Sequence, residues 1–182
     1  MASSPQGALS PLAWIERMEP PVSNLLAAAQ SALSADGWHP EAATDAPALT
    51  MGYHGDNGVY ECMVIVDDAS ALLLCTALAR VTVAAERQPP LLEYLNLANV
   101  ALDAGSLEML PDATAIRART AIEGKAGQVT PEQICRVMQR ACEVIDHYSP
   151  GVAAICNTRI GAAGAMALVA HRAALARSDA GG

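Results

Sequence analysis

The sequence predicts a single α+β domain, in which helices pack on an antiparallel sheet in the order α-βββ-α-ββ-α with an extra C-terminal helix. Two patterns predict this class. Long stretches with apolar residues at every third or fourth position alternate with short stretches rich in β-branched residues, and tight turns join the short stretches. The 182 residues, of which 52% are hydrophobic, suffice for one sizeable core, and no internal linker is evident.

The N-terminal half is predicted to contain one helix and three antiparallel strands. The helix follows Pro20-Pro21 and ends at Gly37, which is typical of a C-terminal stop. Turns rich in glycine and aspartate connect the strands, which are Leu49–Tyr53, Val59–Val66 and Ala71–Val83.

Apolar residues occupy both faces of the strand Val59–Val66. Successive strand residues point to opposite faces, and the two sets are Cys62, Val64 and Val66 on one face and Val59, Met63 and Ile65 on the other. A sheet with one solvated face would alternate apolar and polar residues, so both faces are expected to be covered. Helices can cover one face, which leaves the other for a partner protein or a second copy of the chain.

The C-terminal half is predicted to contain a helix, a hairpin and a second helix. The first helix starts at Pro89-Pro90 and stops at Gly105, and the hairpin strands are Leu107–Leu110 and Thr114–Ile122. Thr130 caps the second helix, because proline occupies the first helical position and a glutamate and a glutamine are present in the first turn.

A proline–glycine pair interrupts the C-terminal helical pattern. Pro150-Gly151 kinks or ends the second helix, and Val152–Arg177 is an alanine-rich, helical extension before a polar tail. The expected organisation is a flexible N-terminal segment (1–19), the α+β domain (20–157), and the alanine-rich helical extension with its polar tail (158–182).

Polar residues of the first C-terminal helix and the hairpin are the candidates for chemistry. Arg117 and Arg119 share one strand face, and Glu108 is positioned to pair with one of them. The arginines form either a solvated face or a fork for a client carboxylate or main chain. Asn96 and Asn99 are unusual, since amides are mediocre helix formers. They satisfy backbone groups at the helix-to-strand junction or serve recognition.

These motifs, in their order and spacing, resemble the YbjN family over roughly Val59 to Asn157. The matching segments are Leu91-Leu92-Glu93-Tyr94-Leu95-Asn96-Leu97-Ala98-Asn99 with Gly105-Ser106-Leu107-Glu108, the basic strand Ile116-Arg117-Ala118-Arg119-Thr120, and the helix start Thr130-Pro131-Glu132-Gln133-Ile134. Leu107 replaces the usual Phe, and the segment after Asn157 has no counterpart in the family pattern. Members of the family have the fold of type III secretion chaperones and are described as bacterial sensory transduction regulators. The resemblance implies a homodimer that binds protein segments and has no defined catalytic site.

The predicted function is that of a non-enzymatic chaperone, adaptor or regulatory module that binds segments of an unidentified client protein as a homodimer. The residues expected to contact the client or the second copy are Met63, Ile65, Leu73, Arg117 and Arg119. One alternative is a signalling or stress-response regulator whose binding face is masked by its own C-terminal helix. Another is an enzyme with an unrecognised site.

Composition disfavours several other classes. The net charge of −8, with a single lysine, argues against nucleic acid binding. No catalytic, cofactor-binding or metal-binding residues are predicted, because nucleotide, hydrolase and metal motifs are missing and Asp56, Asp67 and Asp68 lie in turns. The five cysteines include no CxxC pair and are expected to be reduced in a cytoplasmic protein. Neither a secretory signal nor a membrane-spanning segment is expected, since the apolar stretch Ile160–Ala170 is too short.

Overall fold

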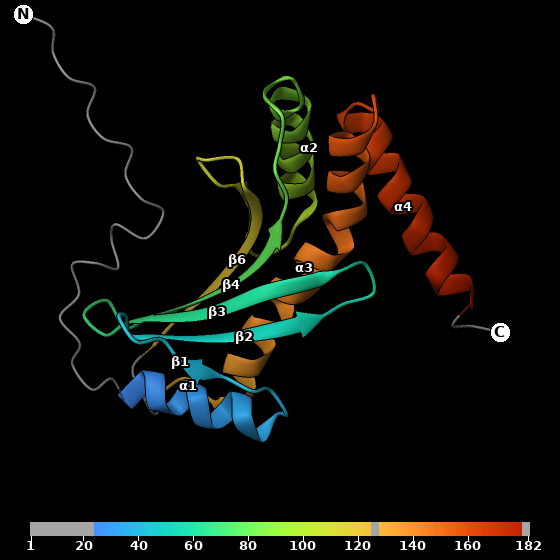
Figure 1. The fold of residues 1–182 in the computed structure, drawn as a ribbon. Helices are drawn as coiled ribbons and strands as arrows, with labels where there is room; N and C mark the ends of the chain where they lie inside the picture. The colour runs from blue at the N-terminus through green and yellow to red at the C-terminus, as the bar shows by residue number, and fades with distance from the viewer. Residues whose placement is uncertain (1–23, 125–127, 180–182) are drawn as a thin grey trace, which may run out of the picture.

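The structure, a computed structural model, describes residues 24–124 and 128–179. In this part of the chain four α-helices accompany a six-stranded antiparallel sheet with the strand order β1-β2-β3-β4-β6-β5, which confirms the predicted α+β class (Figure 1). The strands are β1 (Glu41–Ala42), β2 (Ala48–His54), β3 (Val59–Asp67), β4 (Leu72–Arg80), β5 (Ser106–Met109) and β6 (Ala115–Glu123). The helices are α1 (Asn24–Ala35), α2 (Gln88–Ala101), α3 (Pro131–Asn157) and α4 (Ala162–Asp179), and a short 3-10 helix, η2 (Ala85–Arg87), precedes α2.

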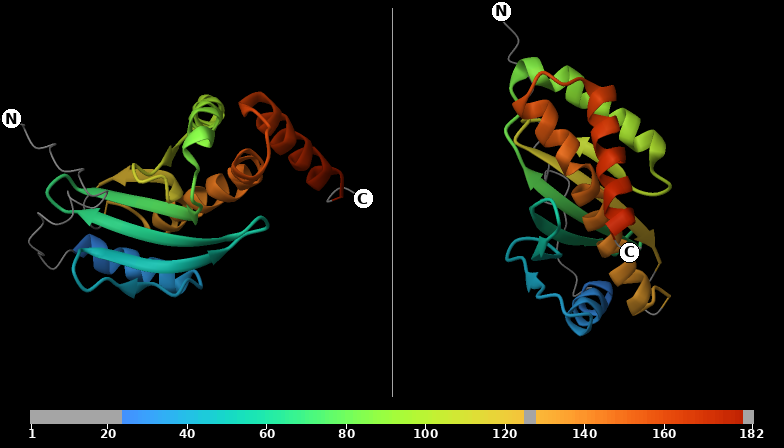
Figure 2. Two further views of the ribbon diagram at one scale, coloured as in Figure 1. Left: turned by 45° about the horizontal axis from the view of Figure 1, so that its top comes forward. Right: turned by 90° about the vertical axis from the view of Figure 1, so that its right-hand side faces the viewer.

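Helices α1 and α3 pack on one face of the sheet, called the core face from here on (Figures 1 and 2). Every second strand residue points to this face, and Val64, Cys75 and Ala118 are among those with no exposed surface. Met138 and Ile145 of α3 belong to the same apolar cluster and are equally buried. The set of β3 residues predicted to share one face therefore forms the centre of the core.

Helix α4 packs mainly on α2 and α3 (Figure 1). Its buried residues are small or β-branched, which permits a close approach between helices, and they include Ala165 and Val169. Arg87 connects η2 to the place where α3 ends, because its Nε and Nη2 donate to the backbone oxygens of Ile155 and Ile160, each at 2.7 Å. A guanidinium at the C-terminal end of a helix binds otherwise unpaired carbonyls and complements the helix dipole.

The start of α3 agrees with the sequence prediction, and of the two alternatives predicted for Pro150-Gly151, a kink or an end of the helix, the end is wrong. Thr130 Oγ1 accepts from the backbone N–H of Gln133 at 3.2 Å, and Gln133 Oε1 accepts from the backbone N–H of Thr130 at 2.8 Å, so the capping box is present. The helix continues through Pro150 as far as Asn157. The expected helical segment Val152–Arg177 is consequently divided between α3 and α4.

The remaining differences concern very short elements. Strand β1 and the 3-10 helix η2 are not predicted, because two or three residues show no periodicity. Gly37 has the positive φ of 89° that its predicted place after α1 requires.

The expected N-terminal segment 1–19 lies outside the described residues, and the division of the chain at residue 158 stays a prediction. None of the described helices has the length and hydropathy that crossing a membrane requires.

Candidate functional site

The face of the sheet opposite α1 and α3, called the outer face from here on, contains a groove of about 640 Å³. Residues of β2, β3, β4 and β6 line it, together with residues that precede β2 and follow β5. No helical residue in the described part of the chain contributes to the lining. The groove is therefore open, and α4 does not cover it.

Cross-strand pairing arranges the outer face in three neighbouring rows. The first row is apolar and consists of Ala48, Ile65, Leu74 and Ala121. The second row is mixed and consists of Thr50, Met63, Thr76, Arg119 and Ser106. The third row carries charges and consists of Gly52, Glu61, Leu78, Arg117 and Glu108. Polarity thus increases away from the β3–β4 turn.

The apolar row has a buried floor and exposed edges. Ile65 is only 4% exposed, because Ala43 and Ala46 of the loop before β2 pack on it. Met63 and Leu74 pack beside it and remain partly exposed. A ligand in the groove would therefore meet the side chain of Met63 beside Ile65, whereas Leu74 lies on the outer face next to the groove.

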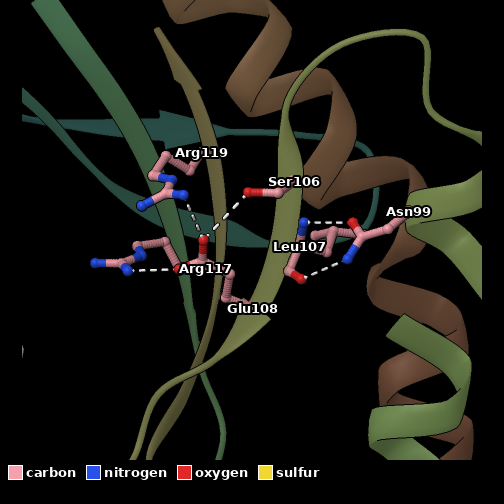
Figure 3. Close-up of polar contacts among 6 residues, drawn as sticks. All are labelled: Asn99, Ser106, Leu107, Glu108, Arg117 and Arg119. Atoms are coloured by element: carbon pink, nitrogen blue, oxygen red, sulfur yellow. Dashed lines mark hydrogen bonds and ion pairs between the residues drawn. The ribbon is translucent and has the colours of Figure 1, made fainter. Parts of the chain in front are cut away.

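Glu108 bridges two arginines across the β5–β6 hairpin (Figure 3). Its Oε2 lies 2.5 Å from Arg117 Nη2 and its Oε1 lies 3.1 Å from Arg119 Nη2, and Ser106 Oγ donates to Oε1 at 3.2 Å. Burial raises the pKa of Glu108, but the hydrogen bond from Arg117 and the charges of both arginines outweigh burial and hold the pKa below its ordinary value. The predicted pairing of Glu108 is confirmed.

These arginines keep donors that Glu108 does not use. Arg117 Nε is buried and has no hydrogen-bond partner. The side chain of Arg119 is 46% exposed. Within the described residues, Glu108 contacts only the Nη2 of this guanidinium. A carboxylate or backbone carbonyl placed on the outer face beside Arg119 could therefore accept hydrogen bonds from it without displacing Glu108.

An exposed ion pair forms another part of the groove's rim. Arg80 Nε and Nη2 donate to the two carboxylate oxygens of Glu61 at 3.0 and 2.7 Å. The hydrogen bond from Arg80 holds the pKa of Glu61 below its ordinary value. Both side chains are 63% exposed, so solvent screens the pair and its contribution to stability is small. Its position suits a role in orienting a partner.

Asn99 holds the edge strand β5 to α2 (Figure 3). Its Oδ1 accepts from the backbone N–H of Leu107 at 2.7 Å, and its Nδ2 donates to the backbone oxygen of Leu107 at 3.0 Å. This confirms the interpretation that the amide satisfies backbone groups at the helix-to-strand junction. Asn96, by contrast, is exposed on α2.

The five residues predicted to contact a partner do not all lie on one surface. Met63, Arg117 and Arg119 lie on the outer face, and Ile65 forms the floor of the groove. Leu73 lies on the core face and is 0% exposed, because its register with Val66 turns it away from the groove. Leu73 therefore does not belong to the candidate surface, and its neighbour Leu74 occupies the outer position.

Several residues of the outer face are not predicted from the sequence. Thr76, Leu78 and Arg80 succeed one another at every second position of β4 and face the groove. Threonine and arginine in an otherwise apolar strand are the signal that could have identified this face. The pair between Glu61 and Arg80 also needs the β3–β4 register, which a sequence pattern does not provide.

The cysteines contribute to the core rather than to a reactive site. All five are free, and Cys62, Cys75 and Cys142 are buried. Cys62 Sγ lies 3.5 Å from Cys142 Sγ, and burial raises the pKa of the Cys75 thiol. In the described ranges no three His, Cys, Asp or Glu side chains are grouped so that they could hold a metal ion.

Comparison with known proteins relates this architecture to one protein family and to two solved structures. The sequence model of the YbjN family, described as "Putative bacterial sensory transduction regulator", matches residues 30–154. The crystal structure of YbjN from E. coli, described as "a putative transcription regulator", shows the same fold at 20% identity with a TM-score of 0.51, covering 66% of this chain and 85% of that chain. The HopA1–SchA chaperone–effector complex is similar at 19% identity with a TM-score of 0.46, covering 68% of this chain and 94% of that chain. No protein with a curated description matches the chain.

Proposed function

This chain belongs to the YbjN family, and from that premise we propose that it is a non-enzymatic regulator or chaperone-type protein that binds segments of client proteins on the outer face of its sheet. The carrying observation is the groove of about 640 Å³, which is formed by strands and loops and has no helix over it. A sheet face with exposed methionine and leucine beside arginine donors suits a segment that contains both apolar and acidic residues.

The three rows suggest how a client segment is held. Met63 provides apolar contact in the groove and Leu74 provides it on the outer face beside the groove, and burial of such side chains drives association. Arg119 provides directional hydrogen bonds to a carboxylate or carbonyl in the next row. Binding of this kind requires no bond to be made or broken, so the mechanism is affinity without turnover.

Self-association is proposed for a different surface. Leu92, Leu97 and Val100 of α2 are 51, 38 and 81% exposed, and they are three of the five large exposed hydrophobic residues in the described ranges. An apolar helix face of this kind is buried when two copies pair about a twofold axis. A homodimer formed through α2 would leave both outer faces free for clients, in the cytoplasm of a bacterial cell.

Client binding can be tested with the full chain immobilised in lysate from its source organism. We expect a stoichiometric partner that the wild type and Gln139→Asp retain and that Met63→Asp loses, because Gln139 is exposed on α3 and Met63 lies in the groove. Chemical cross-links from that partner should map to β3, β4 or β6. A partner retained equally by all three proteins, or cross-linked elsewhere, contradicts the proposal.

The dimer is tested by sedimentation of the purified chain. Val100→Asp should halve the solution mass, because it places a charge in the exposed α2 face, whereas Met63→Asp should leave the mass unchanged. A monomeric wild type, or a dimer that only Met63→Asp dissociates, would remove α2 from the proposal.

A further inference from the structure

The side of α4 that points away from the rest of the chain is apolar. Helix α4 packs on α2 and α3 through Ala165 and Val169, whereas none of residues 170–178 is buried. A cleft of about 620 Å³ lies between this distal part and α3, and the two helices diverge there (Figures 1 and 2). By helical spacing, the side opposite Val169 consists of Ala167, Leu168, His171, Ala174 and Leu175. Leu175 is 52% exposed, so this helix face has no apolar partner in the described part of the chain.

Basic residues flank this face, and no acidic residue interrupts it. The charged residues between Ala162 and Ser178 are Arg172 and Arg177, although the chain as a whole has a net charge of −8. Arg172 Nη2 donates to Asn57 Oδ1 at 2.9 Å, whereas Arg177 has no ion-pair partner within the described ranges. A binding surface for this face is therefore expected to combine apolar side chains with a carboxylate.

The groove of the outer face provides this combination. Met63 and Leu78 are partly exposed in its lining. Among the acidic lining residues, Glu61 and Asp112 already accept hydrogen bonds from neighbouring side chains. The carboxylate of Glu41 also belongs to the lining, but it has no ion-pair partner in the part of the chain that the structure describes. The groove thus offers an apolar surface beside a carboxylate that can accept a salt bridge.

Strand pairing favours a helix as the occupant. Each of the lining strands β2, β3, β4 and β6 has a neighbour on both sides, so their backbone groups bond mainly within the sheet. A segment on this face must satisfy its own backbone, and a helix does so. From β2 to β6 the lining extends over three strand spacings, about 14 Å. Residues 168–178 of α4 span about 15 Å as a helix, so their length suits the groove.

The spacing of apolar and charged groups agrees as well. Glu41, Thr50 and Met63 are successive neighbours in one row, which puts Glu41 two strand spacings, about 10 Å, from Met63. Arg177 follows Leu175 by two residues, a rise of about 3 Å along the helix axis. Its long side chain can cover the remaining distance when Leu175 lies on Met63.

We propose that the distal part of α4 from one copy docks across the outer-face groove of a second copy, with Leu175 against Met63 and Leu78 and Arg177 paired with Glu41. The contact joins two different surfaces, so each copy can both offer its α4 and receive another. One helix face is a small interface, so this contact requires higher concentrations than pairing through α2. A docked α4 excludes a client and thereby regulates the same site. This inference rests on the proposed function, because both assign the groove as a binding surface.

Photo-cross-linking locates the docked helix in the full chain. Leu175→p-benzoylphenylalanine protein is mixed with isotope-labelled wild type, so that mass spectrometry recognises links between copies. We expect links from position 175 of one copy to groove residues of β2, β3 or β4 in the other. The same probe at Arg136, an exposed position of α3, should give no such links. Links confined to α2 or α4, or links equally frequent from both positions, overturn the proposal.

Sedimentation over a range of concentrations measures the assembly in a Val100→Asp background, which removes pairing through α2. The average mass should rise with concentration, and Leu175→Asp should weaken this association about tenfold or more. Gly52→Val should have a similar effect by filling the groove, and it should fold because no atom lies within 4 Å of the added Cβ. Gln139→Asp is the control and should have no effect. A chain that stays monomeric at every concentration, or an association that Gly52→Val leaves unchanged, overturns the proposal.

Charge exchange tests the salt bridge in the same assay. Arg177→Glu and Glu41→Arg should each weaken the association several-fold, and the two changes together should restore it. A double variant that associates as weakly as either single variant overturns the pairing of Arg177 with Glu41.

Competition separates this inference from the proposed function. At concentrations at which the wild type assembles, the Leu175→Asp chain should retain more of the client than the wild type does, and at high dilution the two should retain equal amounts. Equal retention at both concentrations overturns the competition. If no links between copies form while a client still depends on Met63, the inference fails and the proposed function stands. If α4 is cross-linked to the groove but no client binds even the Leu175→Asp chain, the docking stands and the proposed function fails.

Discussion

The side-chain amide of Asn57 donates to the backbone oxygen of Asp146 at 3.1 Å, and this is the carbonyl of α3 that Pro150 leaves without its helical donor. The carboxylate of Asp146 in turn accepts from the backbone N–H groups of Asp56 and Asn57, at 3.2 and 2.8 Å. Tyr60 Oη lies 2.9 Å from the same carboxylate. One residue of α3 thereby fixes the turn between β2 and β3, and that turn completes the hydrogen bonding of α3.

Removing the amide should be costly only while Pro150 is present. We expect Asn57→Ala to lower the free energy of unfolding by about 1–3 kcal/mol, because a helix carbonyl loses its donor. In a Pro150→Ala background residue 150 regains an N–H for the Asp146 carbonyl, so the same change should cost less. Urea denaturation followed by circular dichroism measures all four proteins of the cycle. Equal costs in the two backgrounds would contradict this role of Asn57.

This relationship also explains why one part of the fold could not be predicted. Local patterns predict β2, β3 and the capped start of α3, since periodicity, turn residues and the Thr130 motif are all contained in short windows. The donor for the α3 carbonyl that Pro150 leaves unpaired comes from Asn57, which lies far away in the sequence. A proline that a distant amide compensates cannot be distinguished from one that ends a helix.

The bond between Asn99 and Leu107 should stabilise the chain measurably. Asn99→Ala removes both partners of the Leu107 backbone, and we expect the free energy of unfolding to fall by about 1–3 kcal/mol. Asn96→Ala is the matched control, because Asn96 is exposed on the same helix, and it should change stability by about 0.5 kcal/mol or less. Thermal denaturation compares the two variants. Similar losses in both would show that the β5 junction does not depend on this amide.

Glu108 should make stability depend on pH in the acidic range. A carboxyl group whose pKa is lowered on folding stabilises the protein above its unfolded pKa, and this contribution disappears as the pH falls through the folded pKa. The pKa of Glu108 is lowered from 4.5. The difference in unfolding free energy between wild type and Glu108→Gln should therefore be largest above about pH 5.5 and shrink below about pH 4.5.

Denaturation with urea at a series of pH values measures this difference. Glu93→Gln is the control for the change in net charge, because within the described ranges Glu93 has no ion-pair partner. A difference for Glu108→Gln that grows on acidification would show that its carboxylate is not stabilised by Arg117 and Arg119.

The sequence predicts the candidate-site residues in segments where polar and buried residues alternate. It does not predict those in uniformly apolar segments. Arg117 and Arg119 alternate with buried residues along β6, so their shared face can be deduced from the pattern alone. Residues 72–74 are all leucine, and a run of identical residues gives no information about which faces outwards. The register between β3 and β4 determines which leucine points outwards, because Leu73 pairs with Val66 in the core and Leu74 pairs with Ile65 on the outer face. Such register is set by contacts between strands.

Two adjacent leucines consequently provide a matched test of the outer face. Leu73→Ala should lower the free energy of unfolding by about 2–5 kcal/mol, since it leaves a cavity in the core. Leu74→Ala should cost only about 1 kcal/mol, because its side chain is partly exposed. Under conditions in which both variants are folded, only Leu74→Ala should weaken binding of a client. If Leu73→Ala weakens that binding as much as Leu74→Ala does, the binding surface is not the outer face.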